Sequence, residues 1–129
     1  MESATRERVL SICRLLYDKK AQDIIAIDVE DKTILAEWFI ICSGRASTQV
    51  KALCDEIEQK SNEMGLKILR KEGYRGARWI VLDFGNILLH IFHEDERKYY
   101  NMERLWMDDL KSAILFSKEE DAKLDSGIK

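Results

Sequence analysis

Apolar residues recur along two stretches of this chain at the three- and four-residue spacing of an amphipathic helix. The first stretch covers residues 5–19. The second begins near Ser47, whose hydroxyl is suited to cap a helix, and stops at Gly65, which is suited to the positive φ that often follows a helix. The pattern therefore predicts two long helices, each with one face against a core.

Shorter runs of β-branched, aromatic and aliphatic residues lie between and after these helices. Residues 23–30 are predicted to form a strand that turns at residues 31–32 into a second strand ending at Cys42. Residues 66–69 predict a short strand, and residues 73–93 contain a hairpin. The chain is thus expected to combine helices with about five strands.

The hairpin specifies its own register, because the turn-forming pair Gly85-Asn86 separates two apolar runs. If the turn closes there, one face carries only large apolar side chains and is predicted to be core, with the pairs Phe84–Ile87, Leu82–Leu89 and Ile80–Ile91. The opposite face mixes aromatic, ionisable and aliphatic groups, as protein contact surfaces do, with the pairs Asp83–Leu88, Val81–His90 and Trp79–Phe92. This second face is the candidate functional surface. The alternative is that a helix of the same chain covers it and Trp79 is core.

Beyond the hairpin the chain changes from aromatic to polar. Acidic residues 94–96 stand where a helix N-terminus favours negative charge. A short last helix is predicted to include Met102, Leu105 and Trp106. Residues 1–116 are expected to form a single domain, and the polar residues 117–129 a disordered tail.

The composition is that of an ordinary globular protein. The 129 residues are 46% hydrophobic and 35% charged, which suits one domain with a hydrophobic core. No stretch approaches the roughly 20 apolar residues of a membrane span, and the first residues lack the apolar region of a signal peptide. A cytoplasmic protein with no membrane partner is therefore expected, with its three cysteines reduced.

The charge is slightly acidic overall but uneven. A formal net charge of −3 argues against extensive binding to nucleic-acid phosphates, so little direct nucleic-acid contact is expected. Residues 67–78 nevertheless hold five bases and one acid. This cluster is suited to steer a partner electrostatically, unless it is an ordinary solvated loop.

Few residues fit a known catalytic or metal-binding pattern. His93 begins a sequence like that of zinc proteases, but Arg97 stands where the second histidine is needed. His90 and His93 lie three apart on a strand and hence on opposite faces. Asp28 and Glu30 are spaced to share a strand face, as magnesium-dependent nucleotidyl transfer requires, but such pairs are common at strand ends. We therefore predict no catalytic residues, no metal site and no cofactor.

Several blocks of the sequence, in this order and at these spacings, resemble the Iojap-like ribosomal silencing factors. They are residues 22–29, 39–44, 49–52, 72–75, 78–85 and 100–106. The similarity covers about residues 6–108. It implies a mixed sheet flanked by helices in a nucleotidyltransferase-like fold without the active site. It also implies a translational repressor that binds the fourteenth protein of the large ribosomal subunit and blocks docking of the small subunit.

The resemblance places partner contacts on a set of hairpin and C-terminal residues: Trp79, Leu82, Phe84, His90, Arg97, Tyr100 and Trp106. The alternative for Arg97 is that it neutralises Glu94 and Glu96, and the alternative for Tyr100 and Trp106 is that they pack the last helix onto the sheet. Trp79 is the strongest candidate, because a rigid aromatic side chain often dominates an interface. Leu82 and Phe84 fall on the face predicted to be core, so the pattern and the resemblance disagree about them. Asn86 stands where the family often has Asp, which keeps the turn but removes a charge.

Two other functions stay open at this point. A self-associating interaction module would use the Trp79 face for a homodimer, which is compatible with silencing. A nucleotidyltransferase-like enzyme would need Asp28 and Glu30 beside a magnesium ion.

Overall fold

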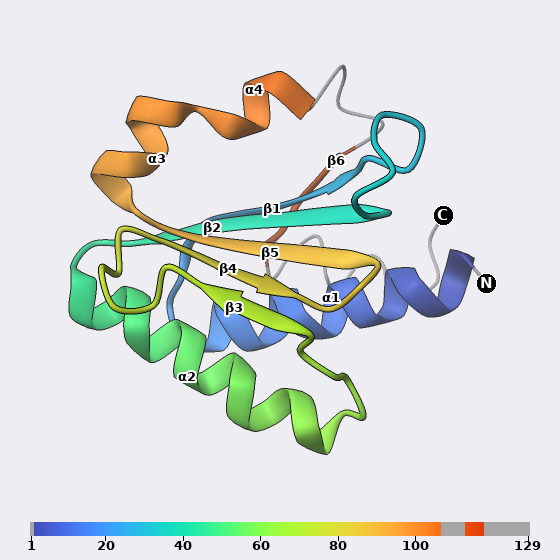
Figure 1. The fold of residues 1–129 in the computed structure, drawn as a ribbon, viewed down its shortest axis with the longest axis horizontal. Coiled ribbons are helices and arrows are strands. Elements are labelled where there is room, and N and C mark those ends of the chain that lie inside the picture. Colours follow the sequence, from blue (N-terminus) through green and yellow to red (C-terminus); the bar gives the residue numbers. More distant parts are fainter. Residues whose placement is uncertain (1, 107–112, 118–129) are drawn as a thin grey trace.

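The computed structural model describes residues 2–106 and 113–117, which form a six-stranded sheet with helices on both faces (Figure 1). The elements are α1 (Glu2–Asp18), β1 (Gln22–Asp28), β2 (Trp38–Gly44), α2 (Ser47–Glu63), β3 (Arg70–Glu72), β4 (Trp79–Asp83), β5 (Ile87–His93), α3 (Glu94–Tyr100), α4 (Met102–Trp106) and β6 (Ala113–Leu115). The strand order is β3-β4-β5-β2-β1-β6. The predicted mixed α/β fold is confirmed.

The central pair β2–β5 is parallel, whereas the other described neighbours are antiparallel. Parallel neighbours need a long crossover connection, which α2, β3 and β4 supply here. In Figure 1, α1 and α2 lie on one face of the sheet and α3 and α4 on the other. We call these the inner face and the outer face.

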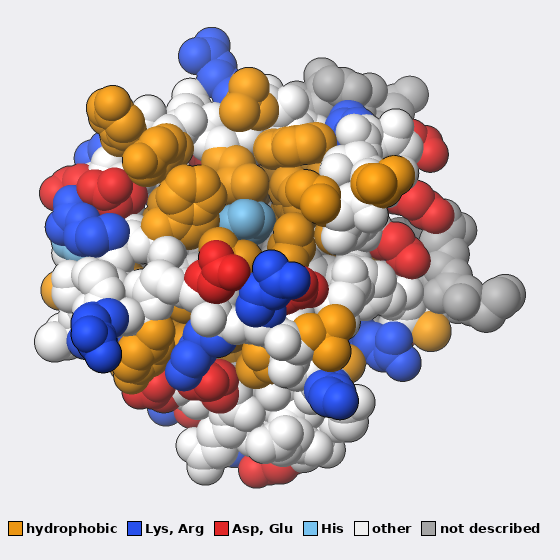
Figure 2. All heavy atoms as spheres, in the orientation of Figure 1, with side chains coloured by type: hydrophobic (Ala, Val, Ile, Leu, Met, Phe, Trp, Pro, Cys, Tyr) orange, Lys and Arg blue, Asp and Glu red, His pale blue; other side chains and the backbone are white. Residues whose placement is uncertain are grey.

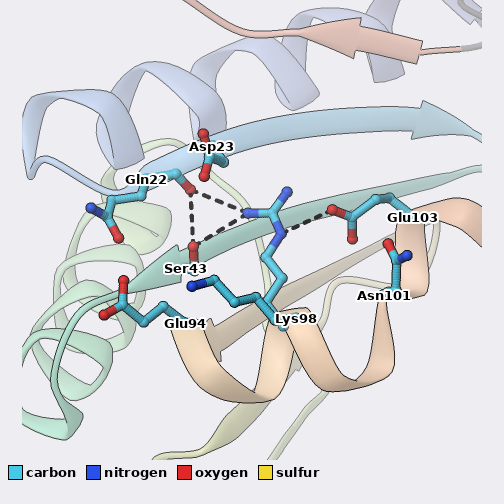
Figure 3. A pocket seen from close by; sticks show the side chains of 8 residues that line it. Gln22, Asp23, Ser43, Glu94, Lys98, Asn101 and Glu103 are labelled. Carbon is cyan, nitrogen blue, oxygen red and sulfur yellow. Dashed lines mark hydrogen bonds and ion pairs between the residues drawn. The ribbon is translucent and has the colours of Figure 1, made fainter.

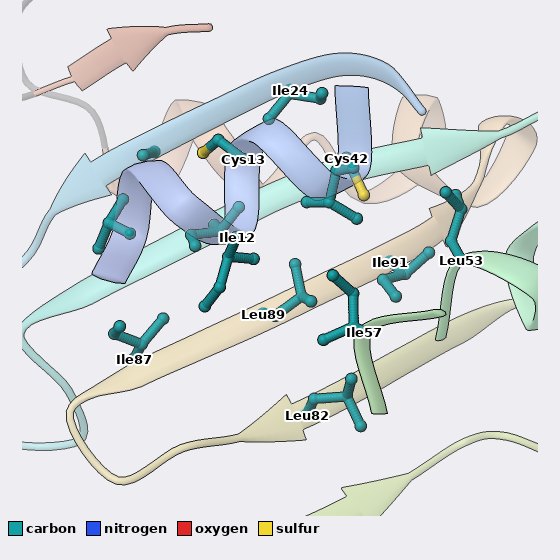
Figure 4. Packing of buried hydrophobic residues seen from close by; sticks show 14 of the residues in the cluster. Ile12, Cys13, Ile24, Cys42, Leu53, Ile57, Leu82, Ile87, Leu89 and Ile91 are labelled. Atoms are coloured by element: carbon teal, nitrogen blue, oxygen red, sulfur yellow. The ribbon is translucent and has the colours of Figure 1, made fainter. Parts of the chain in front are cut away.

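The inner face carries the larger hydrophobic core. Figure 4 shows Ile12 of α1 and Ile57 of α2 packed beside Leu82 and Leu89 of the hairpin. All four side chains are buried, and Leu82 is 0% exposed. Burying each such side chain contributes about 1.5–3 kcal/mol to the free energy of unfolding. Two amphipathic helices thus fix one face of the sheet.

The outer face has a smaller core that reaches across only part of the sheet. Met102 and Trp106 of α4 pack against buried side chains of β1, β2 and β5, namely Ile25, Ile27, Phe39, Ile41 and Phe92. The outward side chains of Trp79, Val81, Asp83 and Leu88 on the hairpin are only partly buried. The helices α3 and α4 therefore cover the β1–β2 side and leave much of the hairpin side open.

The hairpin has the predicted register. Its strands pair Ile80 with Ile91 and Leu82 with Leu89 on the inner face, and Trp79 with Phe92 on the outer face. The backbone N–H of Phe84 donates to the carbonyl of Ile87 (2.9 Å), which closes the two-residue turn. Gly85 adopts φ +96°, a conformation that other residues rarely accept.

Three sequence predictions need correction. The strand expected at 66–69 lies at Arg70–Glu72, because Leu66 is buried in the inner core and the first bond to β4 joins Leu69 N to Asp83 O. Helix α2 is flanked by Ala46 rather than capped by Ser47; the Gln49 side chain instead accepts from Arg45 N (2.7 Å).

The third correction is the sixth strand, β6, which pairs antiparallel with β1 and was not predicted. The predicted polar tail lies almost wholly outside the described residues. Among the residues that the structure describes, no helix is both long and apolar enough to cross a membrane.

Truncation of Leu82 tests its assignment to the core. We expect Leu82→Ala to lower the free energy of unfolding by about 2–5 kcal/mol, because it leaves a cavity under α1 and α2. Val81→Ala, one residue away on the outer face, is the matched control and should cost about 1 kcal/mol or less. Urea unfolding of both variants measures this; equal losses would contradict the assignment of faces.

Candidate interaction face

The outward side chains of the β4–β5 hairpin form a continuous surface that α3 borders on one side. We call it the hairpin face and define it by Trp79, Val81, Asp83, Leu88 and His90. Figure 2 shows hydrophobic side chains gathered between the C-terminal helices and the hairpin, with a histidine among them and charged side chains along their lower margin. This mixture is typical of a protein contact surface.

Trp79 is held by aromatic rings at the centre of this arrangement. Its ring stacks on Phe92 (centroids 4.8 Å apart) and contacts Tyr100 at the end of α3 (5.0 Å). The backbone at Gly73 also passes close to that of Trp79, since an added Cβ would lie 2.1 Å from the Trp79 carbonyl oxygen. The ring contacts therefore orient the indole, which stays only partly buried.

His90 fixes the indole by a hydrogen bond. The Nε1–H of Trp79 donates to Nδ1 of His90 (3.1 Å), so the neutral imidazole carries its proton on Nε2. Nε2 is buried and has no hydrogen-bond partner among the described residues. Burial lowers the pKa of His90 from 6.5 to about 4. The ring is therefore neutral at pH 7 and acts as an acceptor for Trp79.

Tyr100 borders the hairpin face because α3 ends at that residue. The next residue, Asn101, adopts the left-handed conformation that ends many helices. Tyr100 is 47% exposed, and Tyr99 beside it is more exposed. At the other end of α3, the Nδ1 atom of His93 accepts from Asp95 N (3.2 Å), so His93 caps the helix. The two histidines are thus separated as predicted.

Arg97 joins α3, α4 and the sheet and does not belong to the hairpin face. Its guanidinium donates to Glu103 (3.2 Å), to the Gln22 carbonyl (3.3 Å) and to Ser43 Oγ (3.4 Å), bonds that Figure 3 marks. The Arg97 side chain is 10% exposed. A pair this enclosed is costly to break from one side, because the remaining charge would stay buried. Arg97 therefore holds the C-terminal helices in place.

A polar hollow of about 380 Å³ lies beside Arg97, at the ends of β2 and β5 (Figure 3). It contains acids and bases in similar number, and Asp23, Glu94 and Lys98 are among its lining residues. The Arg97 guanidinium is already engaged by protein acceptors. Within the described part of the chain, this hollow has no nucleophile paired with a base.

The remaining predicted contact residues pack within the chain. Leu82 lies in the inner core, and Phe84 packs partly buried against the same cluster. Trp106 packs edge-on against Phe39 (5.0 Å) and helps hold α4 on the sheet. The structure therefore brings together Trp79, His90 and Tyr100, and gives the other predicted residues packing or locking roles.

The sequence analysis missed exposed apolar residues outside the hairpin. Ile34 and Leu35 in the loop between β1 and β2 are 102% and 65% exposed, and Leu105 on α4 is also exposed. Both residues fall in the stretch that the sequence analysis assigned to the start of the second strand, but β2 begins only at Trp38 and the stretch before it is a loop.

Two groups of carboxylates have a composition that could suit a metal ion, but both are engaged within the chain. The Asp28 side chain accepts from Glu30 N (3.1 Å), a local turn contact. Cys54, Asp55 and Glu58 lie close together on α2. Lys71 pairs with Glu58 (3.0 Å) and Tyr74 donates to Asp55 (3.0 Å), so these carboxylates already bind β3 and the loop that follows it. Burial raises the pKa of the Cys54 thiol to about 12, which disfavours the thiolate that a metal needs.

The chain matches a known protein family and named members of it. A family model described as "Ribosomal silencing factor during starvation" matches residues 2–127. A Bacillus subtilis protein named ribosomal silencing factor RsfS is 44% identical over 91 residues, which cover 70% of this chain and 77% of that protein.

A solved structure and a more distant relative also match this chain. A crystal structure of a Bacillus halodurans protein superposes with a TM-score of 0.71 and 38% identity, over 78% of this chain and 94% of that one. A mouse protein named mitochondrial assembly of ribosomal large subunit protein 1 is 25% identical over 95 residues, which cover 71% of this chain and 42% of that protein.

The buried neutral His90 predicts a specific pH dependence of stability. The pKa of His90 is about 4 in the folded protein, whereas its ordinary value is 6.5. As the pH falls, His90 is therefore protonated in the unfolded chain before it is protonated in the folded protein. The free energy of unfolding should therefore drop from about pH 6.5 towards pH 4, with a slope of up to about 1.4 kcal/mol per pH unit from this group. His90→Asn keeps an acceptor and cannot titrate there, so denaturant melts should lose this component. If the free energy of unfolding of the wild type and of His90→Asn depends on pH in the same way, His90 is not the group responsible.

Proposed function

The chain belongs to the family of ribosomal silencing factors, and we propose that it represses translation by binding the large ribosomal subunit and sterically blocking the joining of the small subunit. Residues 1–116 form the working unit, and it acts in the cytoplasm. The contact is made with a protein of the subunit, the fourteenth, and involves little nucleic acid and no membrane.

The observation that carries this proposal is the half-covered outer face of the sheet. α4 packs over Phe39 and Phe92, whereas Trp79, Val81 and Leu88 stay partly exposed. Contiguous apolar surface of this kind, bordered by charges, marks an interaction site more often than a solvated surface. Trp79 is pre-oriented by His90, which lowers the entropy lost on binding.

The choice of the large subunit rests on relatedness. The mouse relative carries the assembly of the large ribosomal subunit in its name, and the resemblance of the sequence blocks implies the same subunit. A protein partner fits the hairpin face better than RNA does, because the face is mainly aromatic and aliphatic and the net charge of the chain is −3.

Silencing of this type needs occupancy and no covalent chemistry. A bound domain fills space that the small subunit must enter, so the fraction of blocked subunits follows the free concentration of the protein relative to its Kd. The contacts of Asp28, Glu58 and Arg97 within the chain are consistent with a protein that binds without catalysis.

A homodimer through the hairpin face is a second proposal that the same exposed residues favour. Two copies related by a two-fold axis would bury Trp79 and Leu88 against each other, and the dimer would then compete with the ribosome. Light scattering on a dilution series tests this directly. A constant monomer mass at all concentrations would contradict it.

Trp79→Ala tests the anchor of the ribosomal contact. Removing a central aromatic anchor typically costs about 2 kcal/mol or more, so the Kd for purified large subunits should rise by roughly 30-fold. Tyr17→Ala, an aromatic change on α1 of the inner layer, is the control and should bind like the wild type. Circular dichroism establishes that both variants are folded. A folded Trp79→Ala protein with wild-type affinity would refute the anchor.

A further inference from the structure

A hollow of about 280 Å³ lies at the margin of the hairpin face, next to the loop between β1 and β2. Its lining residues come from that loop, β3, β4 and β5: Leu35, Arg70, Glu72, Val81, Asp83 and Leu88. This volume is at the small end of pockets that hold whole ligands, about 300–1,000 Å³, and suits one inserted side chain.

The strand register explains why these residues share one surface. Arg70 pairs with Asp83, which pairs in turn with Leu88; one row further, Glu72 pairs with Val81, which pairs with His90. Residues paired directly across strands lie on the same face of a sheet. The strand residues that line the hollow therefore share the outer face of the sheet with His90 and Trp79.

The apolar wall of the hollow is held beside the hairpin. Leu35 is 65% exposed, yet its loop is tied down, because Leu35 N donates to Thr33 Oγ1 (3.1 Å). Glu37 N and Trp38 N both donate to the carbonyl of Asn86 in the hairpin turn (2.8 and 3.1 Å). The backbone at Leu35 is thus held beside the hairpin, where Leu35 and the partly buried Val81 and Leu88 form the apolar wall.

The charged residues that line the hollow are two acids, Asp83 and Glu72, and one base, Arg70. Arg70 lies 3.7 Å from Glu72, so its charge is partly balanced within the chain. Asp83 lines the hollow and accepts the Gly85 backbone N–H at Oδ1 (2.8 Å). The balance of Asp83 and Glu72 against Arg70 favours a cation over an anion.

We propose that this hollow receives a lysine or arginine side chain of the ribosomal protein that the domain binds. The alkyl stem of that side chain lies on Leu35 and Leu88, and its cationic head pairs with Asp83 and Glu72. Long basic side chains bury their stems on apolar surface in this way while the head stays at the polar edge.

This inference rests on the proposed function and adds a second anchor to it. The aromatic anchor at Trp79 supplies apolar contact, whereas the hollow supplies charge and direction. The two anchors lie on neighbouring rows of one rigid hairpin, so a partner that engages both is fixed in orientation.

The test measures the affinity of the full chain for purified large ribosomal subunits at two salt concentrations. Asp83→Asn keeps the acceptor for Gly85 N and removes the charge; we expect about a tenfold weaker Kd at low salt and a smaller difference at high salt, because screening weakens the pair. Leu35→Ser should weaken binding at both salt concentrations. Glu63→Gln, an exposed acid on α2, is the matched control and should have no effect.

The sign of a second substitution identifies the occupant. Arg70→Gln makes the hollow more acidic, so a basic side chain should bind as well as before or more tightly. Weaker binding of Arg70→Gln would indicate an acidic occupant and overturn the inference. If the wild type binds, Trp79→Ala binds more weakly and Asp83→Asn matches the wild type, the hollow assignment is wrong and the proposed function stands. If the wild type itself does not bind large subunits, both the hollow assignment and the proposed function are wrong.

Discussion

The register of the β4–β5 hairpin is the constraint on which the rest of the structure depends. Side chains alternate between the faces of a strand, so a slip of one residue would exchange the two faces completely. The turn at Gly85, with φ +96°, sets that register and places Leu82 and Leu89 under the helices α1 and α2. The same alternation leaves Val81 and Trp79 on the outer face. One turn thus separates the residues that stabilise the fold from those available to a partner.

The C-terminal helices cover the outer face of the sheet unevenly. The Arg97–Glu103 pair and the bonds of Arg97 to the sheet fix α3 and α4 over the β1–β2 side. The packing of Trp106 on Phe39 adds to this. The hairpin side is left open, with Tyr100 at its border and His90 holding the Trp79 indole. A rigid, partly apolar surface suits a repressor that acts by occupying a site.

The sequence predicted the hairpin correctly because local rules determine it: alternation fixes the faces, and Gly85-Asn86 fixes the turn. It did not predict the packing role of Arg97, because Gln22 and Ser43 are far from it along the chain and Glu103 reaches it only through the turn between α3 and α4. The strand β6 was missed because three residues carry too little periodicity, and its pairing with β1 is a tertiary contact. The disagreement over Leu82 was between a local pattern and a family resemblance, and the burial of Leu82 follows the pattern.

The central claim is that occupancy of the large subunit prevents subunit joining. The most direct measurement is a gradient in which purified large and small subunits are mixed with increasing amounts of the protein, and joined particles and the position of the protein are scored together. We expect the protein to migrate with the large subunit and joined particles to decline in proportion to its occupancy. Undiminished joining at full occupancy of the large subunit would contradict steric repression.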